Sequence, residues 1–480
     1  MNNLQFLRSK LSKKNKPKKK EITMAIIPQL NLFSWDKIEV SSELNRLKLV
    51  LVSIPDEIFV CTLEVKRQKG RDDYPVRPMW NTLLAGIVFQ HKTVAKLLRE
   101  LKRNAELRQI LGFNPLLGDS AVPTEAAFSR FVKSVIENQN LLTQMFHNLV
   151  AELKTELPDL GKDIAIDSKA IPSFGKPVND EKKKESHDGR RDVDANWGVK
   201  SYKGIHKDGT SWEKVTKWFG YKLHLMVDSN YELPLAFSVD VASSSDMTNL
   251  LPLVENLSEN HTEIYENVEK ASADRGYDSA KNKSELFDLH NIKPIIDTRI
   301  LKKEDKDKPQ KLFGDRYDVF TFNEQGQVFC HCPKTEERRE LVSYGFEKKR
   351  GTLKFRCPAA HYGFECKGRE DCEKCSPLGT GEYGRVVRIP IGMDRRIFTP
   401  VNKSTNQWQK DYNKRTSVER VNGRIDQVLG FEYHTIRGKD KMKMRLSLAL
   451  VIMLSMALGR IRNGQKDKMR SLIAPVAKVA

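Results

Sequence analysis

Long apolar runs are missing from this sequence of 480 residues. The longest extends from Leu446 to Gly459 and includes two serines, whereas a membrane-spanning helix needs about 20 apolar residues. A secretory signal is also missing, because the first 20 residues carry many lysines with no apolar segment behind them. These absences predict a protein that has no membrane partner and works in the cytoplasm.

Cysteines and acidic residues are both in short supply. Seven cysteines, an odd number, fit thiols or metal ligands better than disulfides. The 63 acidic residues are outnumbered by 83 lysines and arginines, which leaves a formal net charge of +20. A surplus of that size indicates a polyanionic partner, of which nucleic acid is the commonest. It argues against a small neutral substrate as the protein's whole function.

The composition and length are those of a folded protein with several domains. The chain is 39% hydrophobic and 30% charged, and its length suggests about two to four domains. Residues 1–22 form a basic arm that either contacts DNA or stays solvated. Residues 23–157 have helical periodicity, for example over 93–102 and 125–141. Short helices in a basic context are typical of a DNA-reading helix-turn-helix, and an ordinary helical bundle produces the same pattern.

From residue 158 onward, strand and helix patterns alternate. They predict an α/β core with one mixed sheet, formed by 158–300 and 400–460 and followed by a basic tail at 461–480. Residues 176–217 are polar and are expected to form a long loop. The predicted strands are 163–167, 219–228, 233–241, 268–274 and 293–297, and the predicted helices are 247–257, 279–290, 411–429 and the uniformly apolar, buried 442–458.

Three acidic residues stand where a metal site would need them. Asp167 and Asp274 end two predicted strands, and the carboxyl ends of strands form the usual active-site edge of an open α/β sheet. Glu419 lies in a predicted helix that could cover this edge. Carboxylate oxygens are preferred ligands of Mg²⁺ and Mn²⁺. Two such ions side by side activate the attacking oxygen in phosphoryl transfer and stabilise the leaving one.

The helix that carries Glu419 adds two more residues suited to nucleic acid. Tyr412, Arg415 and Glu419 are spaced by three and four, so they share one face of that helix. Arginine binds phosphate through its planar guanidinium, and the tyrosine can stack on a base. We predict DNA contacts for both residues, and also for Arg420 and Arg424 on the same helix.

These residues resemble a known family. The spacing Tyr412-x2-Arg415-x3-Glu419 is similar to the start of the Tyr-Arg-Glu-Lys signature of DDE transposases from bacterial insertion sequences. The segments around Asp167, Asp274 and 220–228 resemble the catalytic core of that family, and 101–131 resembles its helical N-terminal domain. Together these segments cover roughly residues 80–460. One position departs from the pattern, because the lysine expected seven residues after the glutamate is Asp426 here.

The resemblance implies a fold, a reaction and a site. The fold would be ribonuclease-H-like. The protein would bind the terminal inverted repeats of its own insertion sequence, nick the strands and transfer the 3′-hydroxyls into target DNA, with two Mg²⁺ or Mn²⁺ ions held by Asp167, Asp274 and Glu419. Joining two ends implies a homodimer on DNA. The aspartate at position 426 implies a weaker grip on DNA, a cation supplied from elsewhere, or a decayed copy.

A cysteine-rich insertion is expected between the second and third acids. Residues 301–399 hold six of the seven cysteines, and the connection is too long for a simple link from sheet to helix. Thiolates in such number can complete a tetrahedral zinc site, with His331 and His361 as further candidates, and a set of free thiols is the alternative. The possible ligands are Cys330, Cys332, Cys357, Cys366, Cys372 and Cys375.

A few other residues and two other functions complete the predictions. His224 is expected to pack inside its strand, and Asp246 to cap the helix that follows. Trp197 and Trp212 are expected to lie in the polar loop, where they could stack on a base, and Trp218 is expected to anchor the hairpin. The alternatives to a transposase are a non-catalytic zinc-containing DNA-binding protein and a nuclease of the same fold.

Overall fold

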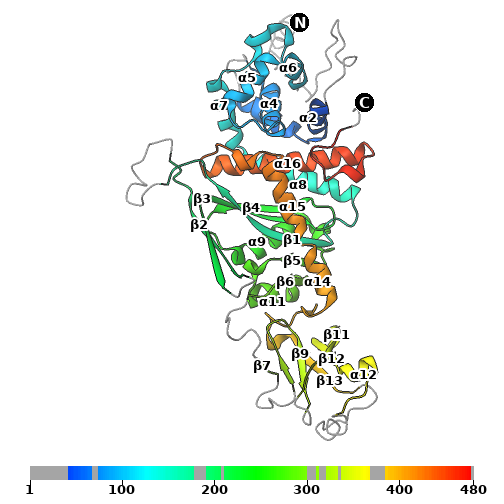
Figure 1. Ribbon diagram of the computed structural model, residues 1–480. Coiled ribbons are helices and arrows are strands. Elements are labelled where there is room, and N and C mark those ends of the chain that lie inside the picture. The colour runs from blue at the N-terminus through cyan, green and yellow to red at the C-terminus, as the bar shows by residue number, and fades with distance from the viewer. Residues whose placement is uncertain are drawn as a thin grey trace, which may run out of the picture.

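The structure is a computed structural model that describes residues 42–67, 74–177, 191–206, 210–299, 310–312, 320–332, 337–367 and 384–476. Figure 1 shows three parts in a row: a group of helices near the N-terminus, a sheet with helices beside it, and a small β subdomain. The predicted basic arm, 1–22, lies outside the described residues, as do the last four residues of the predicted basic tail.

The N-terminal part is helical, as the periodicity predicts. Its helices begin at polar caps: the Thr93 and Thr124 hydroxyls accept hydrogen bonds from the backbone N–H groups of Lys96 and Ala127. The helix predicted over 125–141 is instead two helices that meet at residues 137–138. The helices are α2 (Ser42–Ser53), α3 (Glu57–Arg67), α4 (Val76–Val88), α5 (Val94–Arg103), α6 (Ala105–Leu111), η2 (Pro115–Ala121), α7 (Glu125–Ile136) and α8 (Gln139–Glu156).

The central sheet is mixed, which confirms the predicted fold class. The strand order is β2-β3-β1-β5-β6, and β4 also pairs with β3. Strand β1 is antiparallel to β3 and parallel to β5, which is parallel to β6. The strands are β1 (Asp163–Pro172), β2 (Asn196–Ile205), β3 (Ser211–Asp228), β4 (Pro234–Val241), β5 (Lys270–Ala273) and β6 (Lys293–Ile296).

Helices pack on this sheet and join it to the N-terminal part. Helix α15 (Thr416–Gln427) contacts β1 and β3, and α9 (Asp246–Asn260) contacts the same strands and β4. Short α10 (Thr262–Tyr265), α11 (Ala280–Asp288) and α14 (Asn406–Asn413) complete the set. Phe146 of α8 packs edge-on against Phe237 of β4. One hydrophobic core therefore runs through the helical part and the sheet, although the sequence treats them as separate domains.

Helix α16 (Lys439–Arg462) is the buried apolar helix that the sequence predicts. It contacts α2, α4, α7, α8 and β4, and lies between the helical part and the sheet in Figure 1. Among the described helices it alone is long and apolar enough to cross a membrane. Most of its apolar stretch is buried inside the protein, as in the central helix of a globular core.

The long loop predicted over 176–217 is wrong in its second half. Strands β2 and β3 pair over Asn196–Ile205 and Ser211–Gly220 as a two-stranded ribbon. Both faces of this ribbon meet solvent: Trp197, Val199 and Val215 on one face are about half exposed, and Trp212 and Lys214 on the other face are exposed as well. Because neither face is buried, the ribbon has polar and charged residues on both faces. Its sequence therefore lacks the apolar–polar alternation of a strand and predicts a loop. Trp218 does anchor the base, since it is buried and donates from Nε1 to the carbonyl of Tyr221 at 3.1 Å.

The segment between β6 and α14 is an inserted β subdomain with its own core. Strands β7 (Gln310–Lys311), β8 (Phe320–Phe322), β9 (Val328–His331) and β10 (Arg338–Glu340) form one sheet. Strands β11 (Val342–Glu347), β12 (Thr352–Arg356) and β13 (Val386–Pro390) form another, with α12 (Pro358–Tyr362) nearby. Buried Phe322, Phe355 and Phe398 belong to a hydrophobic cluster separate from the main core. Short helical turns η4 (Arg275–Tyr277), η6 (Lys348–Arg350), η7 (Ile391–Met393), η8 (Phe431–Tyr433) and η9 (Lys466–Lys468) make the remaining connections.

Candidate active site

Asp167 and Asp274 lie side by side on neighbouring strands. Strand β1 does not end at Asp167, as predicted, but continues to Pro172. Its parallel pairing with β5 stops at Ile166 and Ala273, so the two aspartates follow directly on paired residues. Neighbouring strands are about 4.8 Å apart. Burial, and then the negative charge of Asp274, raise the pKa of Asp167 from 3.8 to about 6. The two carboxylates therefore form a repelling pair of the kind that a cation neutralises.

The turn after β5 fixes the position of Asp274. Its Oδ1 accepts a hydrogen bond from the backbone N–H of Gly276 at 2.7 Å and so caps η4. A Cβ added at Gly276 would lie 2.7 Å from that oxygen and 3.1 Å from Oδ2 of Asp246. A methyl group at this position would therefore displace the Asp274 carboxylate. The same geometry makes Asp246 a near neighbour of Asp274.

Glu419 forms an ion pair with Arg415, which lies between Tyr412 and Glu419 in the sequence. Arg415 Nη2 binds Oε1 of Glu419 at 2.8 Å, and the Arg415 guanidinium lies 5.5 Å from the ring centre of Tyr412. Burial acts to lower the pKa of Arg415, but the charges of Tyr412, Glu419 and Asp167 outweigh it and raise the pKa, so Arg415 lies within electrostatic range of both acids. Tyr412 also stacks on Trp408, with ring centres 4.7 Å apart. The three signature residues therefore lie next to one another, and of the three Arg415 is the one whose charge acts on Asp167.

The helix predicted over 411–429 is two helices. Helix α14 ends at Asn413 and α15 begins at Thr416, and the backbone N–H groups of Lys414 and Arg415 bond three residues back rather than four. Arg415 thus lies in a tight turn, which directs it to Asp167. The helical spacing predicts the right neighbours because a tight turn of this kind keeps residues three and four apart on one side.

The chemistry of the acidic pair fits a divalent cation, while Glu419 lies apart from it. Within the described part of the chain, no group of three histidine, cysteine, aspartate or glutamate side chains is close enough together to hold a metal ion. Glu419 is half exposed and engaged by Arg415. Asp167 and Asp274 would hold a hard cation through carboxylate oxygens, and Glu419 would first have to leave Arg415.

Lys169 of β1 lies beside Asp426, the position of α15 at which the family signature has a lysine. Lys169 Nζ pairs with Asp426 of α15, and the Lys169 side chain is 13% exposed. Lys169 is two residues beyond Asp167, so both side chains project from the same face of the strand. The aspartate at the expected lysine position therefore holds a lysine next to the acidic pair, although the two residues are 257 positions apart.

Arg420 and Arg424 point away from the acidic pair. Both bind the carboxylate of Glu232, which is 4% exposed; the distance from Arg420 Nε to Oε1 is 2.7 Å. Glu232 follows the turn at the end of β3 and thereby ties α15 to the β3–β4 hairpin. This gives both arginines a structural partner, and their contact with DNA stays a prediction.

Further polar residues lie close to the acidic pair, and of these the sequence singles out only His224 and Asp246. His224 and Ser168 are paired across β3 and β1, and both are buried. Burial lowers the pKa of His224 to about 4, so the ring is neutral at pH 7. Asp246 is not the predicted N-cap: Ser245 holds that position, and the Asp246 carboxylate binds Lys222 at 3.0 Å. Burial, and then the charges of Asp246, Asp167 and Asp274, raise the pKa of the fully buried Tyr277.

The cysteines that the structure describes form no disulfide and no metal cluster. Cys330 and Cys332 lie at the end of β9, Cys357 precedes α12, and the Cys366 sulfur accepts a hydrogen bond from Arg339 at 2.7 Å. His331 bonds the Thr321 hydroxyl, and His361 that of Tyr344. Cys372 and Cys375 lie outside the described residues, and a zinc site stays a prediction.

Comparison with known families decides the assignment. A family described as "Transposase DDE domain" matches residues 160–455, which is more than half of the chain and includes both aspartates, Glu419 and the whole β subdomain. The chain belongs to this family of DDE transposases. The match begins before β1 and ends inside α16, so the inserted subdomain lies within the transposase domain.

Two further comparisons add little. No curated protein sequence matches this chain. A cryo-electron microscopy structure of the piggyBac transposase synaptic complex with hairpin DNA aligns at 13% identity over 92% of this chain and 84% of that one, with a TM-score of 0.37. A likeness this loose bears on neither site nor partner, so the assignment rests on the domain match.

Proposed function

We propose that this DDE transposase binds the terminal inverted repeats of a bacterial insertion sequence of the Tyr-Arg-Glu-Lys type, nicks the strands and transfers the 3′-hydroxyls into target DNA. The observation that carries the proposal is the Asp167–Asp274 pair with Arg415 beside it. Two carboxylates that repel each other attract cations, and an arginine next to them attracts phosphate. The net charge of +20 suits a DNA partner in the nucleoid of a bacterial cytoplasm, without a membrane.

In this proposal the residues divide the work. Asp167 and Asp274 hold Mg²⁺ or Mn²⁺, and Glu419 joins them once DNA phosphate has taken its place on Arg415. Two such ions, when bound, activate the attacking oxygen and neutralise the leaving one. Arg415 and Tyr412 orient the scissile phosphate, and Lys169 supplies a further cation on the same side. Zinc in the β subdomain would have a structural role, since four protein ligands leave no open position.

The test is incubation with Mn²⁺ and DNA that carries the flanking repeats, scored for nicked and for joined products. We expect both products from the wild type and neither from Asp167→Ala, which should still bind the DNA. A protein that binds but never cuts is the non-catalytic DNA-binding protein. One that cuts without joining is the nuclease. Two ends must be joined, so the active species is a homodimer, which sedimentation of the DNA complex tests.

A further inference from the structure

A cavity of about 630 Å³ lies where the helical part meets the catalytic core. Its walls come from the α4–α5 turn, from Phe174 just beyond β1, from the loop after η8 and from the first turns of α16. Thr435 Oγ1 bonds the carbonyl of Lys92 at 2.8 Å, and the Phe174 N–H bonds the carbonyl of Ile436 at 3.1 Å. These bonds join the walls and give the cavity a fixed shape.

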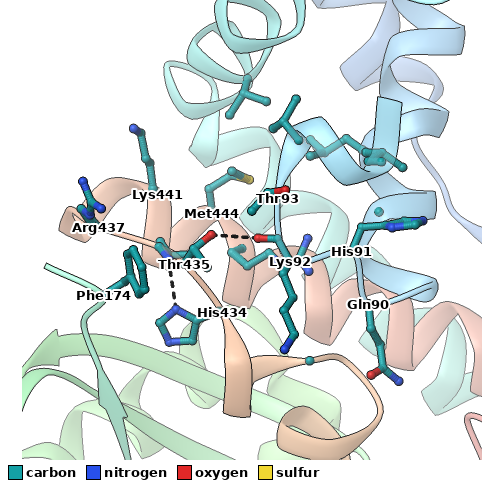
Figure 2. Close-up of a pocket in the computed structure, with 18 of the residues that line it drawn as sticks. Gln90, His91, Lys92, Thr93, Phe174, His434, Thr435, Arg437, Lys441 and Met444 are labelled. Atoms are coloured by element: carbon teal, nitrogen blue, oxygen red, sulfur yellow. Dashed lines mark hydrogen bonds between the residues drawn. The ribbon is translucent and has the colours of Figure 1, made fainter. Parts of the chain in front are cut away.

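The lining is cationic. No acidic side chain is among the described residues that line it, whereas six basic ones are, namely His91, Lys92, His434, Arg437, Lys441 and Arg445. In Figure 2, Lys92 and Lys441 come from different walls, and their side chains point in opposite directions. Burial and the nearby Arg445 lower the pKa of His434 to about 4. Burial also lowers the pKa of His91, so the positive charge of the lining at pH 7 comes from the two lysines and the two arginines, with no side chain of opposite sign among the described residues of the lining.

Arg445 lacks an anionic partner in this cavity. Its guanidinium lines the cavity and has no hydrogen bond or ion pair with any residue that the structure describes. Burial alone lowers its pKa to about 10. Arg445 is partly buried, and a guanidinium partly removed from water without a partner is stabilised by an anion. The N-terminus of α5 lies at the same cavity and adds a further preference for an anion.

The distance from the acidic pair favours DNA as the source of that anion. Phe174 lies seven residues after Asp167, just beyond the end of β1, which corresponds to at most roughly 23 Å at about 3.3 Å per residue. Duplex DNA advances 3.4 Å per base pair, so a duplex that runs in the direction of β1 with a phosphate at Asp167 would present backbone phosphates near the cavity about seven base pairs away.

We infer that this cavity binds a backbone phosphate of DNA about seven base pairs from the cleaved position. Arg445 and Lys441 contact the phosphate, and Lys92 and Arg437 flank it. The contact links the helical part to the core, so DNA binding fixes both parts with respect to the cleaved bond. The inference rests on the proposed function for its occupant, and a free nucleotide is the other source of the same phosphate chemistry.

The test uses the full chain and a fluorescent duplex of about 30 base pairs, with affinity measured by anisotropy over a series of salt concentrations. The variants are Lys441→Met and Arg445→Met. Lys443→Met is the matched control, because Lys443 is an exposed lysine of the same helix that does not line the cavity. Each cavity variant should lose about tenfold in affinity and lower the slope of log affinity against log salt by about one. The control should lose less than twofold.

Three results would overturn the inference or what it rests on. If the wild type binds the duplex and all three variants bind equally well, the inference is wrong and the proposed function stands. If the wild type binds no DNA at all, the proposed function fails as well. If the cavity variants lose affinity only for a mononucleotide such as dAMP and not for the duplex, the cavity serves a free nucleotide. Lys441 is exposed, so its variant tests the inference even if Arg445→Met unfolds.

Discussion

In the metal-free protein, the ionised carboxylate of Asp167 should lower the free energy of unfolding. The pKa of Asp167 is raised from 3.8 to about 6, and each pKa unit corresponds to about 1.4 kcal/mol. The ionised carboxylate therefore costs the folded state up to roughly 3 kcal/mol relative to the unfolded chain. This cost is absent below pH 3.8, grows as the pH rises and is complete above pH 6. Asp167→Asn removes the charge and keeps the shape.

We therefore expect the inactive variant to be the more stable protein. In EDTA at pH 7.5, Asp167→Asn should raise the free energy of unfolding by about 1–3 kcal/mol, measured by urea denaturation. At pH 4.5 most of the difference should vanish, because the wild-type carboxyl is then largely protonated. Mn²⁺ should stabilise the wild type and leave the variant unchanged, since only the wild type offers both carboxylates.

Asp119→Asn serves as the control for Asp167→Asn, and one outcome would refute the reasoning. Asp119 is an exposed aspartate of η2, and Asp119→Asn should change stability by less than about 0.5 kcal/mol at either pH. If Asp167→Asn is less stable than the wild type at pH 7.5 in EDTA, burial and the charge of Asp274 together do not destabilise the ionised Asp167 carboxylate. The cation site deduced from that destabilisation would then have no physical basis.

Three further predictions concern single contacts. Gly276→Ala should reduce nicking by at least about tenfold with little loss of stability, because the new methyl group displaces the adjacent carboxylate. Lys169→Asp should lower the free energy of unfolding by about 1–3 kcal/mol, and adding Asp426→Lys should restore it by reversing the ion pair. Asp56→Ala should cost about 3–5 kcal/mol in urea denaturation, because it leaves the fully buried Arg77 guanidinium without its closest partner.

Each of these has a matched control in the chain. Gly392 has open space around its Cβ position, so Gly392→Ala should leave nicking unchanged. Glu57 also binds Arg77 but is half exposed, so Glu57→Gln should cost less than about 1 kcal/mol. Equal losses from the paired variants would contradict the roles given to close packing and to burial. A double reversal of Lys169 and Asp426 that is no better than the single one would contradict their pairing.

The sequence predicts those helices and strands in which one buried face makes apolar residues recur at regular intervals. The β3–β4 hairpin, α9, α11 and α16 lie close to their predicted ranges, because each buries a regular apolar face in one core. The β2–β3 ribbon escapes prediction because both its faces are exposed. The break before α15 escapes it because a tight turn and a continuous helix have nearly the same spacing of side chains.

Some residues of the candidate site are likewise predictable from the sequence, and others are not. Asp167 and Asp274 are predictable since each follows buried strand residues, and strand pairing brings them together. The pairing of Lys169 with Asp426 is not readable from the chain, because it depends on α15 crossing β1 at one particular place. The same holds for the tie between Arg424 and Glu232. Such partners are far apart in sequence, and only packing determines them.

The central claim is that Asp167 and Asp274 act together on a DNA phosphate. The most direct measurement is a strand-transfer assay with Mn²⁺ and end DNA, run on the wild type, Asp167→Asn, Asp274→Asn and the folded control Asp119→Asn. We predict joined product from the wild type and the control, and none from either of the other two, whose DNA affinity should be unchanged. Joined product from Asp274→Asn at the wild-type rate would contradict the account.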